Sequence, residues 1–290
     1  MAAEETLLGG VGALRERYLA DERWARRTLY AGVVIVGILT VVAVLAPLIA
    51  THSPTDQNLT QTFRPPSREH LMGTDNLGRD VFSRVVFATR IDLQIGLLLT
   101  YVPFVFGVIL GAVAGYFGRW VDTIIMRLVD VVIAFPFLVL IIAFLAVFGP
   151  GVESIYVAVF IVGWSMYARL SRAEMLVLKE QEFMLAAQAL GYSRTRIIFR
   201  HAIPNLLGPN LVFSMADFVL NILLVASLSF LGLGVQPPTP EWGAIVADGR
   251  HFLVQGWWIA TLPGLVIVFA GVGFSLIGDG LSERLGKSVS

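Results

Sequence analysis

Residues 182–205 read EFMLAAQALGYSRTRIIFRHAIPN, a charged and helix-prone stretch inside an otherwise apolar chain. Charged side chains are costly to place in lipid, so we expect this segment to lie outside the bilayer. Its small side chains would let another surface approach the helix closely. The charged residues include Glu182, Arg194, Arg196 and Arg200, and the small ones are Ala186, Ala187 and Ala189. The stretch is therefore predicted to bind a soluble partner.

The same stretch carries the signals of two helices joined by a turn. Gly191 can adopt the left-handed conformation that ends a helix, and Ser193 can cap the next helix. Pro204 is predicted to stop that second helix. An ordinary surface helix-turn-helix between two membrane spans would carry the same signals.

The stretch resembles the cytoplasmic "EAA" coupling loop of ATP-binding-cassette importer permeases. The family pattern is Glu-Ala-Ala, then Gly, and later an apolar residue followed by Pro. Leu185 stands here in place of the Glu, and His201 in place of the usual Ile. The matching positions are Ala186, Ala187, Gly191, Ile203 and Pro204. The resemblance implies contact with an ATPase through Glu182, Phe183, Ala186, Ala187, Ala189, Gly191, Tyr192 and Pro204.

Composition identifies the class of protein. Of the 290 residues, 56% are hydrophobic and only 14% are charged, and the mean hydropathy is +0.76. A soluble domain of this size carries far more charge, so a membrane protein with several helical spans is predicted. The formal net charge of zero suggests no nucleic-acid partner. The lack of cysteine excludes disulfides, thiolate metal sites and a cysteine nucleophile.

Six segments are apolar and long enough to cross a bilayer, which takes about 20 residues each. We place them at 29–50, 94–117, 128–149, 152–169, 206–232 and 258–279. Lys and Arg concentrate in short cytoplasmic segments, and an N-in, C-in topology puts all but six of the 21 basic residues on that side. The other predicted parts are a cytoplasmic segment 1–28, an external loop 51–93, a core 94–282 that includes the coupling loop 170–205, and a cytoplasmic tail 283–290.

The predicted external loop contains HLMGTDNLGRD at residues 70–80. Gly73 and Gly78 are predicted to bracket a tight turn in which Asp75 bonds the local backbone. The acidic spacing does not match a calcium-binding EF-hand loop. The segment resembles the Gly-Thr-Asp-x-x-Gly-Arg-Asp signature of the C-type subunits of dipeptide and oligopeptide permeases, and residues 228–243 resemble another segment of these subunits. The signature positions are Gly73, Thr74, Asp75, Gly78, Arg79 and Asp80.

Two patterns lie inside predicted spans. Gly107, Gly111 and Gly115 are spaced four apart, which favours close packing of two membrane helices; a flexible hinge is the lesser alternative. A polar stripe with spacings of four, three and four lies on one face of the fifth span. It consists of Asn210, Ser214, Asp217 and Asn221. This stripe either lines a translocation path or forms hydrogen bonds between helices, and the sequence favours neither.

Three tryptophans flank the outer end of the last predicted span: Trp242, Trp257 and Trp258. Tryptophan is enriched at membrane–water interfaces, and these residues are predicted to form part of such an aromatic belt.

The sequence lacks a motif for binding ATP. Gly286-Lys287-Ser288 mimics the end of a phosphate-binding loop, but that motif requires Gly at position 281, which is Leu. ATP and Mg are therefore expected on partner ATPase subunits, and no cofactor is expected on this chain.

No metal site is predicted either. Four histidines are present: His52, His70, His201 and His251. Their spacing does not match the His-Glu-x-x-His motif of zinc enzymes, and lone histidines in loops are mostly plain polar residues. A zinc or nickel site built from the three outer-loop histidines, and with it a membrane metalloenzyme, remains the weaker alternative.

The resemblance covers essentially the whole chain from the first span onward. It implies an all-α, six-span permease of the type I importer fold in the bacterial cytoplasmic membrane, with no enzymatic activity of its own. It further implies a heterodimer with a related B-type permease, two ATPase subunits, an external substrate-binding protein and a di- or oligopeptide substrate. The same resemblance leaves open the alternative of an importer permease for nickel chelates, glutathione or other small solutes. A secondary transporter driven by an ion gradient would leave the Ala-rich loop unexplained.

Overall fold

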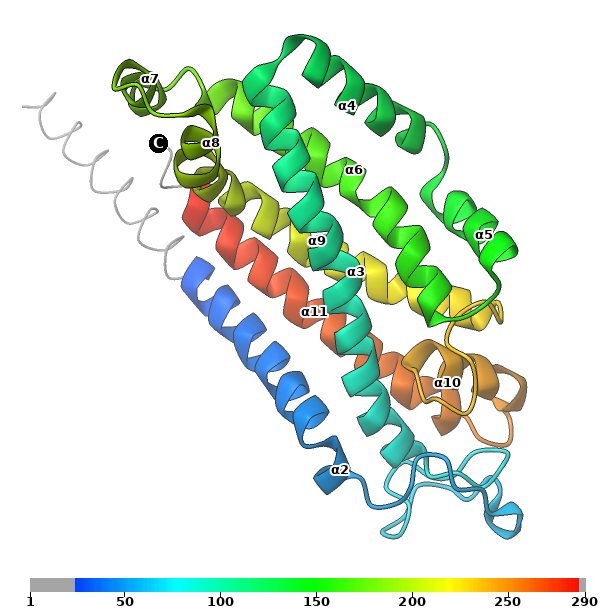
Figure 1. Cartoon of the computed structure of the whole chain (residues 1–290). Helices are drawn as coiled ribbons and strands as arrows, with labels where there is room; N and C mark the ends of the chain where they lie inside the picture. The colour runs from blue at the N-terminus through cyan, green and yellow to red at the C-terminus, as the bar shows by residue number, and fades with distance from the viewer. Residues whose placement is uncertain (1–23, 287–290) are drawn as a thin grey trace, which may run out of the picture.

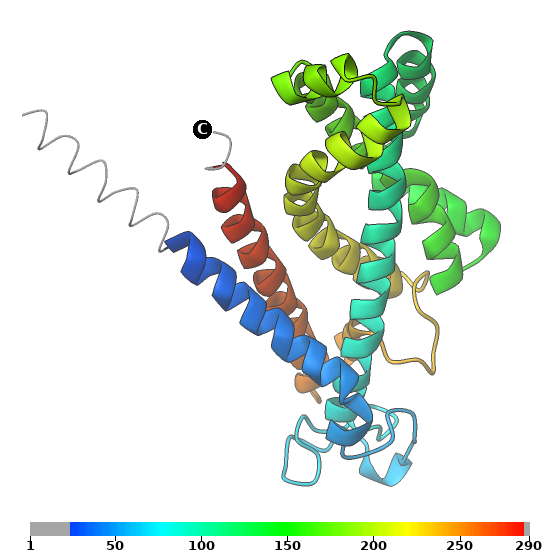
Figure 2. The same cartoon turned by 60° about the vertical axis from the view of Figure 1, so that its left-hand side comes forward.

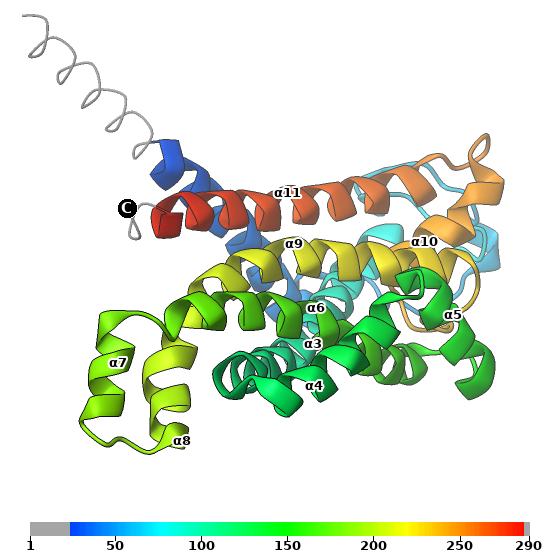
Figure 3. The ribbon, with the colours of Figure 1, turned by 90° about the horizontal axis from the view of Figure 1, so that it is seen from above.

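The computed structural model of the protein describes residues 24–286, which are mostly helical and contain no β-strand. The long helices form a bundle with two distinct ends (Figure 1). Helices α7 and α8 lie at one end, here called the α7 end. Helix α10 and the loop 51–80 lie at the other, here called the α10 end, and the view from above separates the two ends clearly (Figure 3).

The elements follow one another along the chain, and the longest connection is the loop between α2 and α3. The N-terminal helix is Trp24–Val44. The next helices are α2 (Ala46–Ile49), α3 (Val81–Phe117), α4 (Arg119–Ile133), α5 (Phe137–Phe148), α6 (Val152–Leu178) and α7 (Glu182–Ala189). The remaining ones are α8 (Arg194–Arg196), a π-helical turn (Ile197–Ala202), α9 (Ile203–Phe230), α10 (Trp242–Gly249) and α11 (Trp258–Gly286). Two short 3₁₀ helices cover Leu59–Gln61 and Arg250–Phe252.

Within residues 24–286, five helices are long and apolar enough to cross a membrane, and a sixth crossing results if α4 and α5 are taken together. These two helices are bent by 85° relative to each other, so the third predicted span, 128–149, is not one straight helix. Pro136 accounts for the break. Proline disfavours helical geometry in the preceding residue, here Phe135, and has no backbone N–H to donate.

Several predicted boundaries differ from the observed ones. Helix α3 begins at Val81, so the end of the predicted loop 51–93 is helical. Asp80 caps this helix, because its Oδ2 accepts a hydrogen bond from the backbone N–H of Ser83 at 2.8 Å. Helix α6 continues to Leu178, beyond the predicted end of the fourth span. The predicted segments 1–28 and 283–290 lie largely outside the described residues.

Pro204 does not end a helix, contrary to the prediction. It lies in the first turn of α9, which continues the preceding helix through the π-helical turn. In this turn the N–H of Ile203 donates to the carbonyl of Ile198, five residues earlier. The wider turn lets the helix pass a proline, because proline lacks an N–H and its ring would clash with the carbonyl four residues earlier in an α-helix.

The N-terminal helix packs along α11 at one side of the bundle, with most of its side chains exposed (Figure 2). The two helices approach closely at glycines. Gly280 of α11 lies against Leu29, and Gly32 lies against the backbone of α11 at Gly273 and Ile277. The first helix is thus an addition to the side of the core.

Two of the three tryptophans predicted for an aromatic belt are buried inside the protein. Trp242 is fully buried, and Trp258 is 6% exposed. The indole N–H of Trp258 donates to the carbonyl of Thr74 at 3.1 Å. These residues hold the loop and α10 against the bundle, and only Trp257 is exposed.

The glycine stripe of α3 lies against α6. A Cβ added to Gly107, Gly111 or Gly115 would collide with atoms of α6. At Gly111 the collision would involve the backbone carbonyl of Ala168 and the Cβ of Ser171. Because backbone cannot move aside, only glycine permits this separation of the two helices.

This contact generates a prediction for stability. Gly111→Leu should destabilise the protein by about 1–3 kcal/mol or more, since overpacking forces helices apart. The melting temperature of the detergent-solubilised chain measures the effect. Gly37→Leu is the matched control, because a Cβ at Gly37 meets nothing within 4 Å. Equal melting temperatures for the two variants would contradict the assigned role of Gly111.

Candidate functional site

Helix α7 lies at one end of the bundle and is joined to α8 by a tight turn. Gly191 has a φ of 73°, the left-handed geometry predicted for it. The Ser193 hydroxyl accepts a hydrogen bond from the N–H of Arg196 at 3.3 Å and caps α8. The Arg196 guanidinium lies over the Tyr192 ring, with Cζ 4.0 Å from the ring centroid. The turn is therefore fixed by local contacts.

One face of α7 is anchored in the bundle. Met184 and Ala187 are buried in an apolar cluster with Ala112 of α3, Met175 of α6 and Leu206 of α9. Ala187, which the sequence pattern placed on the docking surface, is only 4% exposed and faces inward. The buried side of α7 thus connects it mechanically to three long helices.

The opposite face of α7 is exposed and partly apolar. Phe183 and Leu185 are both more than 40% exposed, and Leu190 just after the helix is 71% exposed. The other exposed positions are Glu182, Ala186, Gln188 and Ala189, and Gly191 and Pro204 are exposed nearby. Large apolar side chains gathered at one exposed end are typical of a protein-binding surface.

A groove of about 920 Å³ runs beside this face. It lies where the end of α3 and the start of α4 meet α7, and basic residues contribute to its wall. The lining includes Tyr116, Arg119, Trp120, Lys179, Leu185 and Arg194. This groove was not predicted from the sequence, because its residues come from three separate segments.

Helix α4 is held to α6 by two ion pairs that sequence reasoning missed. Arg172 forms a two-pronged contact with Asp122, in which the Nη2–Oδ2 distance is 2.6 Å. Arg169 and Asp130 are 3.2 Å apart and more exposed. Paired fork geometry between arginine and carboxylate is strong and directional, so the Asp122 pair orients α4.

All four residues of the polar stripe form hydrogen bonds within the bundle. The Ser171 hydroxyl donates to Asn210 Oδ1 at 3.1 Å, and the Ser214 hydroxyl donates to the carbonyl of Leu211 at 2.7 Å. Asn221 Nδ2 donates to Thr100 Oγ1 at 3.1 Å. Asn210 therefore joins α9 to α6 and Asn221 joins α9 to α3, as in the packing alternative, whereas the Ser214 bond stays within α9.

Asp217 differs from the rest of the stripe. Its Oδ2 accepts hydrogen bonds from the Tyr167 hydroxyl at 2.8 Å and from Asn221 Nδ2 at 3.1 Å. Asp217 and Asn221 also line a cavity of about 590 Å³ between the bend of α4 and α5, helix α6 and α9. Asp217 thus joins helices through its hydrogen bonds and also lines the cavity.

The walls of this cavity are largely apolar. Asp217 is the one charged residue among the described residues that line it, and the others include Phe135, Leu138, Val162, Met166, Phe213 and Leu220. A carboxylate in apolar surroundings attracts a cationic or hydrogen-bond-donating group. The cavity is suited to a small, amphipathic molecule with an ammonium group.

The predicted turn at the α10 end has the expected geometry. Gly73 and Gly78 have φ values of 74° and 72°. Asp75 Oδ1 accepts hydrogen bonds from the N–H groups of Leu77 and Arg79, both at 2.9 Å. The Asp75 side chain therefore holds the backbone of the turn.

Charged residues tie this turn to α10. Arg79 Nε lies 2.5 Å from Asp75 Oδ2, and Arg79 Nη2 lies 3.2 Å from Asp248 Oδ2. Arg84 lies within 4 Å of both carboxylates, and both arginines are buried. Buried charges persist only when they are paired, so Arg79, Asp75 and Asp248 form a structural clamp.

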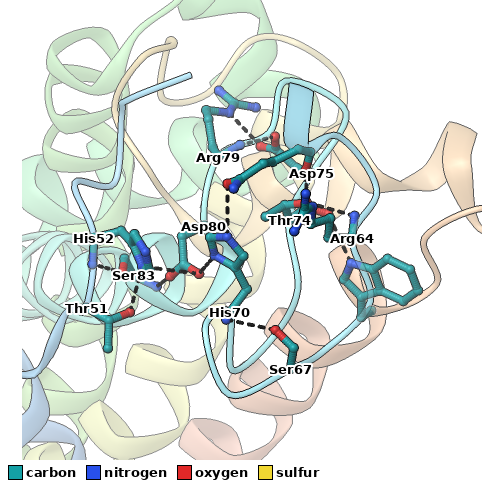
Figure 4. Close-up of polar contacts among 12 residues, drawn as sticks. Thr51, His52, Arg64, Ser67, His70, Thr74, Asp75, Arg79, Asp80 and Ser83 are labelled. Atoms are coloured by element: carbon teal, nitrogen blue, oxygen red, sulfur yellow. Dashed lines mark hydrogen bonds and ion pairs between the residues drawn. The ribbon is translucent and has the colours of Figure 1, made fainter. Parts of the chain in front are cut away.

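A group of three side chains lies beside this clamp (Figure 4). His70 Nδ1 is 2.9 Å from Asp80 Oδ1, and His52 Nδ1 is 3.8 Å from the same oxygen. Among the described residues, His52, His70 and Asp80 form a compact set of groups able to hold a metal ion. His251 is outside this set, and its Nε2 accepts a hydrogen bond from Arg250.

Comparison with known proteins agrees with this architecture. Residues 107–290 match the family described as binding-protein-dependent transport system inner membrane component. Residues 25–66 match the N-terminal TM domain of oligopeptide transport permease C.

Several curated relatives are similar over most of their length. The dipeptide transport system permease protein DppC of Alkalihalophilus pseudofirmus is 41% identical over 88% of this chain and 84% of its own. The probable D,D-dipeptide transport system permease protein DdpC of Escherichia coli is 38% identical over 87% and 85%. DppC of Bacillus subtilis is 38% identical over 91% and 84%. The chain therefore belongs to the family of binding-protein-dependent transport system inner membrane components.

Proposed function

We propose that this chain is the C-type permease subunit of an ATP-driven importer for di- or oligopeptides. The observation that carries the proposal is the exposed apolar face of α7, which lies on a helix anchored to three long helices of a binding-protein-dependent permease. Peptide as the substrate rests on the relatives, whose names describe dipeptide and peptide transport.

The proposed orientation places the α7 end in the cytoplasm. Short segments at that end carry much of the positive charge, including Arg119, Lys179, Arg194, Arg196 and Arg200. Positive charge in short loops favours the cytoplasmic side. The α10 end then faces outward, where a substrate-binding protein would deliver the peptide.

Partner subunits would complete the transporter. A related B-type permease would cover the apolar side chains that α4, α5 and the bend between them expose, among them Leu128, Val131, Phe135 and Val147. Two ATPase subunits would bind ATP and Mg, and one of them would contact α7 and the adjacent groove. This chain contributes no catalytic residue to hydrolysis.

Movement would pass from α7 to the membrane helices by direct contact. When the ATPases close, they displace α7, and Met184 and Ala187 transmit the displacement to the cluster they share with α3, α6 and α9. Tightly packed interiors transmit strain because they have few voids to absorb it. The permease pair would then alternate between outward-open and inward-open states.

The cavity beside Asp217 would form this subunit's share of the path. The Asp217 carboxylate would bind the ammonium group of the peptide, and the apolar walls of the cavity would contact the peptide side chains. The hydrogen bonds from Tyr167 and Asn221 hold the carboxylate in place.

Co-purification tests the assignment as an importer. Pull-down of the detergent-solubilised chain followed by mass spectrometry should recover a second permease and ATPase subunits. The isolated chain reconstituted in liposomes should move no solute. Solute movement by the chain alone, without ATP, would instead establish a secondary transporter.

A substitution on α7 tests coupling. Ala186→Glu adds bulk and charge to the exposed face, and burying an unpaired carboxylate in an interface is costly. ATP-dependent transport by the assembled complex should fall at least about tenfold, which corresponds to roughly 1.4 kcal/mol. ATPase activity that no longer responds to substrate would accompany this loss.

Ala186→Ser is the matched control, because it adds one hydroxyl at the same position. Both variants should melt at the wild-type temperature, since Ala186 is exposed. If Ala186→Glu still couples ATP hydrolysis to transport as the wild type does, α7 is not the contact with the ATPase. The buried neighbour Ala187 is unsuitable, because its replacement disturbs the core.

Asp217→Asn separates charge from packing. Asparagine can keep hydrogen bonds to Tyr167 and Asn221 but removes the negative charge. Uptake of a dipeptide by the reconstituted complex should fall about tenfold, with assembly unchanged. Asp217→Leu removes the hydrogen bonds as well and should also weaken packing. If Asp217→Asn transports normally while Asp217→Leu fails to assemble, Asp217 is a packing residue only.

A further inference from the structure

We propose that His52, His70 and Asp80 bind a divalent first-row transition-metal cation, with Zn²⁺ as the representative ion. The sequence alone predicts no such site, because the three residues are separated along the chain and follow no metal-binding motif. In the structure their candidate ligand atoms all lie within 4.8 Å of one another. Figure 4 shows the three side chains converging on one point at the α10 end.

The separations are compatible with metal coordination. Imidazole and carboxylate ligands lie about 2.0–2.2 Å from zinc, so neighbouring ligand atoms are roughly 3–3.5 Å apart. His70 Nδ1 and Asp80 Oδ1 are 2.9 Å apart, and His52 Nδ1 is 3.8 Å from that oxygen. The His52 side chain is 39% exposed, so a small rotation brings it into range without disturbing the core.

Two of the three ligands already have the supporting contacts that metal ligands require. His70 Nε2 is 3.2 Å from Gln61 Oε1, so an imidazole with its proton on Nε2 can donate there and present its Nδ1 lone pair to a metal ion. Asp80 Oδ2 accepts the hydrogen bond from Ser83 N, which leaves Oδ1 for the metal. Outer hydrogen bonds of this kind fix the tautomer and orientation of ligands.

His52 extends the His70–Asp80 pair to a third candidate ligand. Its Nδ1 also lies 3.0 Å from the Thr51 hydroxyl, a contact that metal binding would replace. The His52 ring lies over the His70 ring, with centroids 4.7 Å apart, and its backbone N–H donates to Ser83 Oγ at 3.0 Å. His52 is thus held where its Nδ1 reaches the same carboxylate.

The donor set indicates the class of cation. Two imidazole nitrogens and one carboxylate oxygen suit zinc and its neighbours, whereas calcium and magnesium prefer oxygen ligands alone. A site with three protein ligands keeps a further position for water, which the exposed side of His52 permits. The ion would join the segment after α2 to the loop and to the start of α3, and would stabilise the adjacent clamp.

Zinc titration of the full-length, untagged chain in detergent tests the proposal. After treatment with EDTA, isothermal titration calorimetry with ZnCl₂ should show one saturable site per chain. His52→Gln should weaken this site by about tenfold or more, and at the same zinc concentration the melting temperature should rise less for His52→Gln than for the wild type. CaCl₂ should produce neither effect.

His251→Gln is the matched control, because His251 is a loop histidine at the same end and lies outside the group. It should bind zinc like the wild type. Asp80→Asn provides a second variant and should abolish the site. Absence of saturable zinc binding in the wild type, or wild-type affinity in His52→Gln, would overturn the proposal. These outcomes do not depend on transport and leave the proposed function untouched.

Discussion

The contact between α3 and α6 is the constraint on which the rest of the structure depends. Gly107, Gly111 and Gly115 bring the two backbones together, and in lipid such close packing replaces the hydrophobic drive that water supplies to soluble proteins. With α6 fixed in this position, Arg172 can hold α4 through Asp122, and Tyr167 can reach Asp217. The cavity, the bent pair α4–α5 and the base of α7 are all arranged around this pair.

Features with a local cause were predictable from the sequence. The φ values of Gly73, Gly78 and Gly191 and the cap at Ser193 follow from neighbouring residues alone. The apolar spans were found because their signal is a long run of apolar residues. The all-helical architecture followed from these features, and the family followed from the resemblance of residues 70–80 and 182–205 to known permease motifs.

Features that depend on distant residues were not predictable. Nothing near Ala187 indicates that it faces a cluster formed by three other helices, and nothing near Trp242 indicates that it is buried and not at a membrane interface. Tyr167, which donates to Asp217, and Arg172, which pairs with Asp122, are each 50 residues away from their partner. For the polar stripe the sequence left two alternatives, and the structure shows hydrogen bonding for all four residues but a cavity beside only Asp217 and Asn221. Proline likewise indicates an irregular helix without showing which kind. The chain bends at Pro136, whereas at Pro204 the helix continues through a π-helical turn.

The π-helical turn before Pro204 sets the rotation of α9 about its own axis. A π-turn contains one residue more than an α-helical turn, and one residue corresponds to about 100° of helix rotation. The proline opposes conversion to a regular α-helix, because its ring would then meet the carbonyl of Arg200. A single ring near the α7 end therefore helps to set the azimuth of the whole helix, since a shift by one residue would turn Asp217 about 100° away from the cavity that it lines.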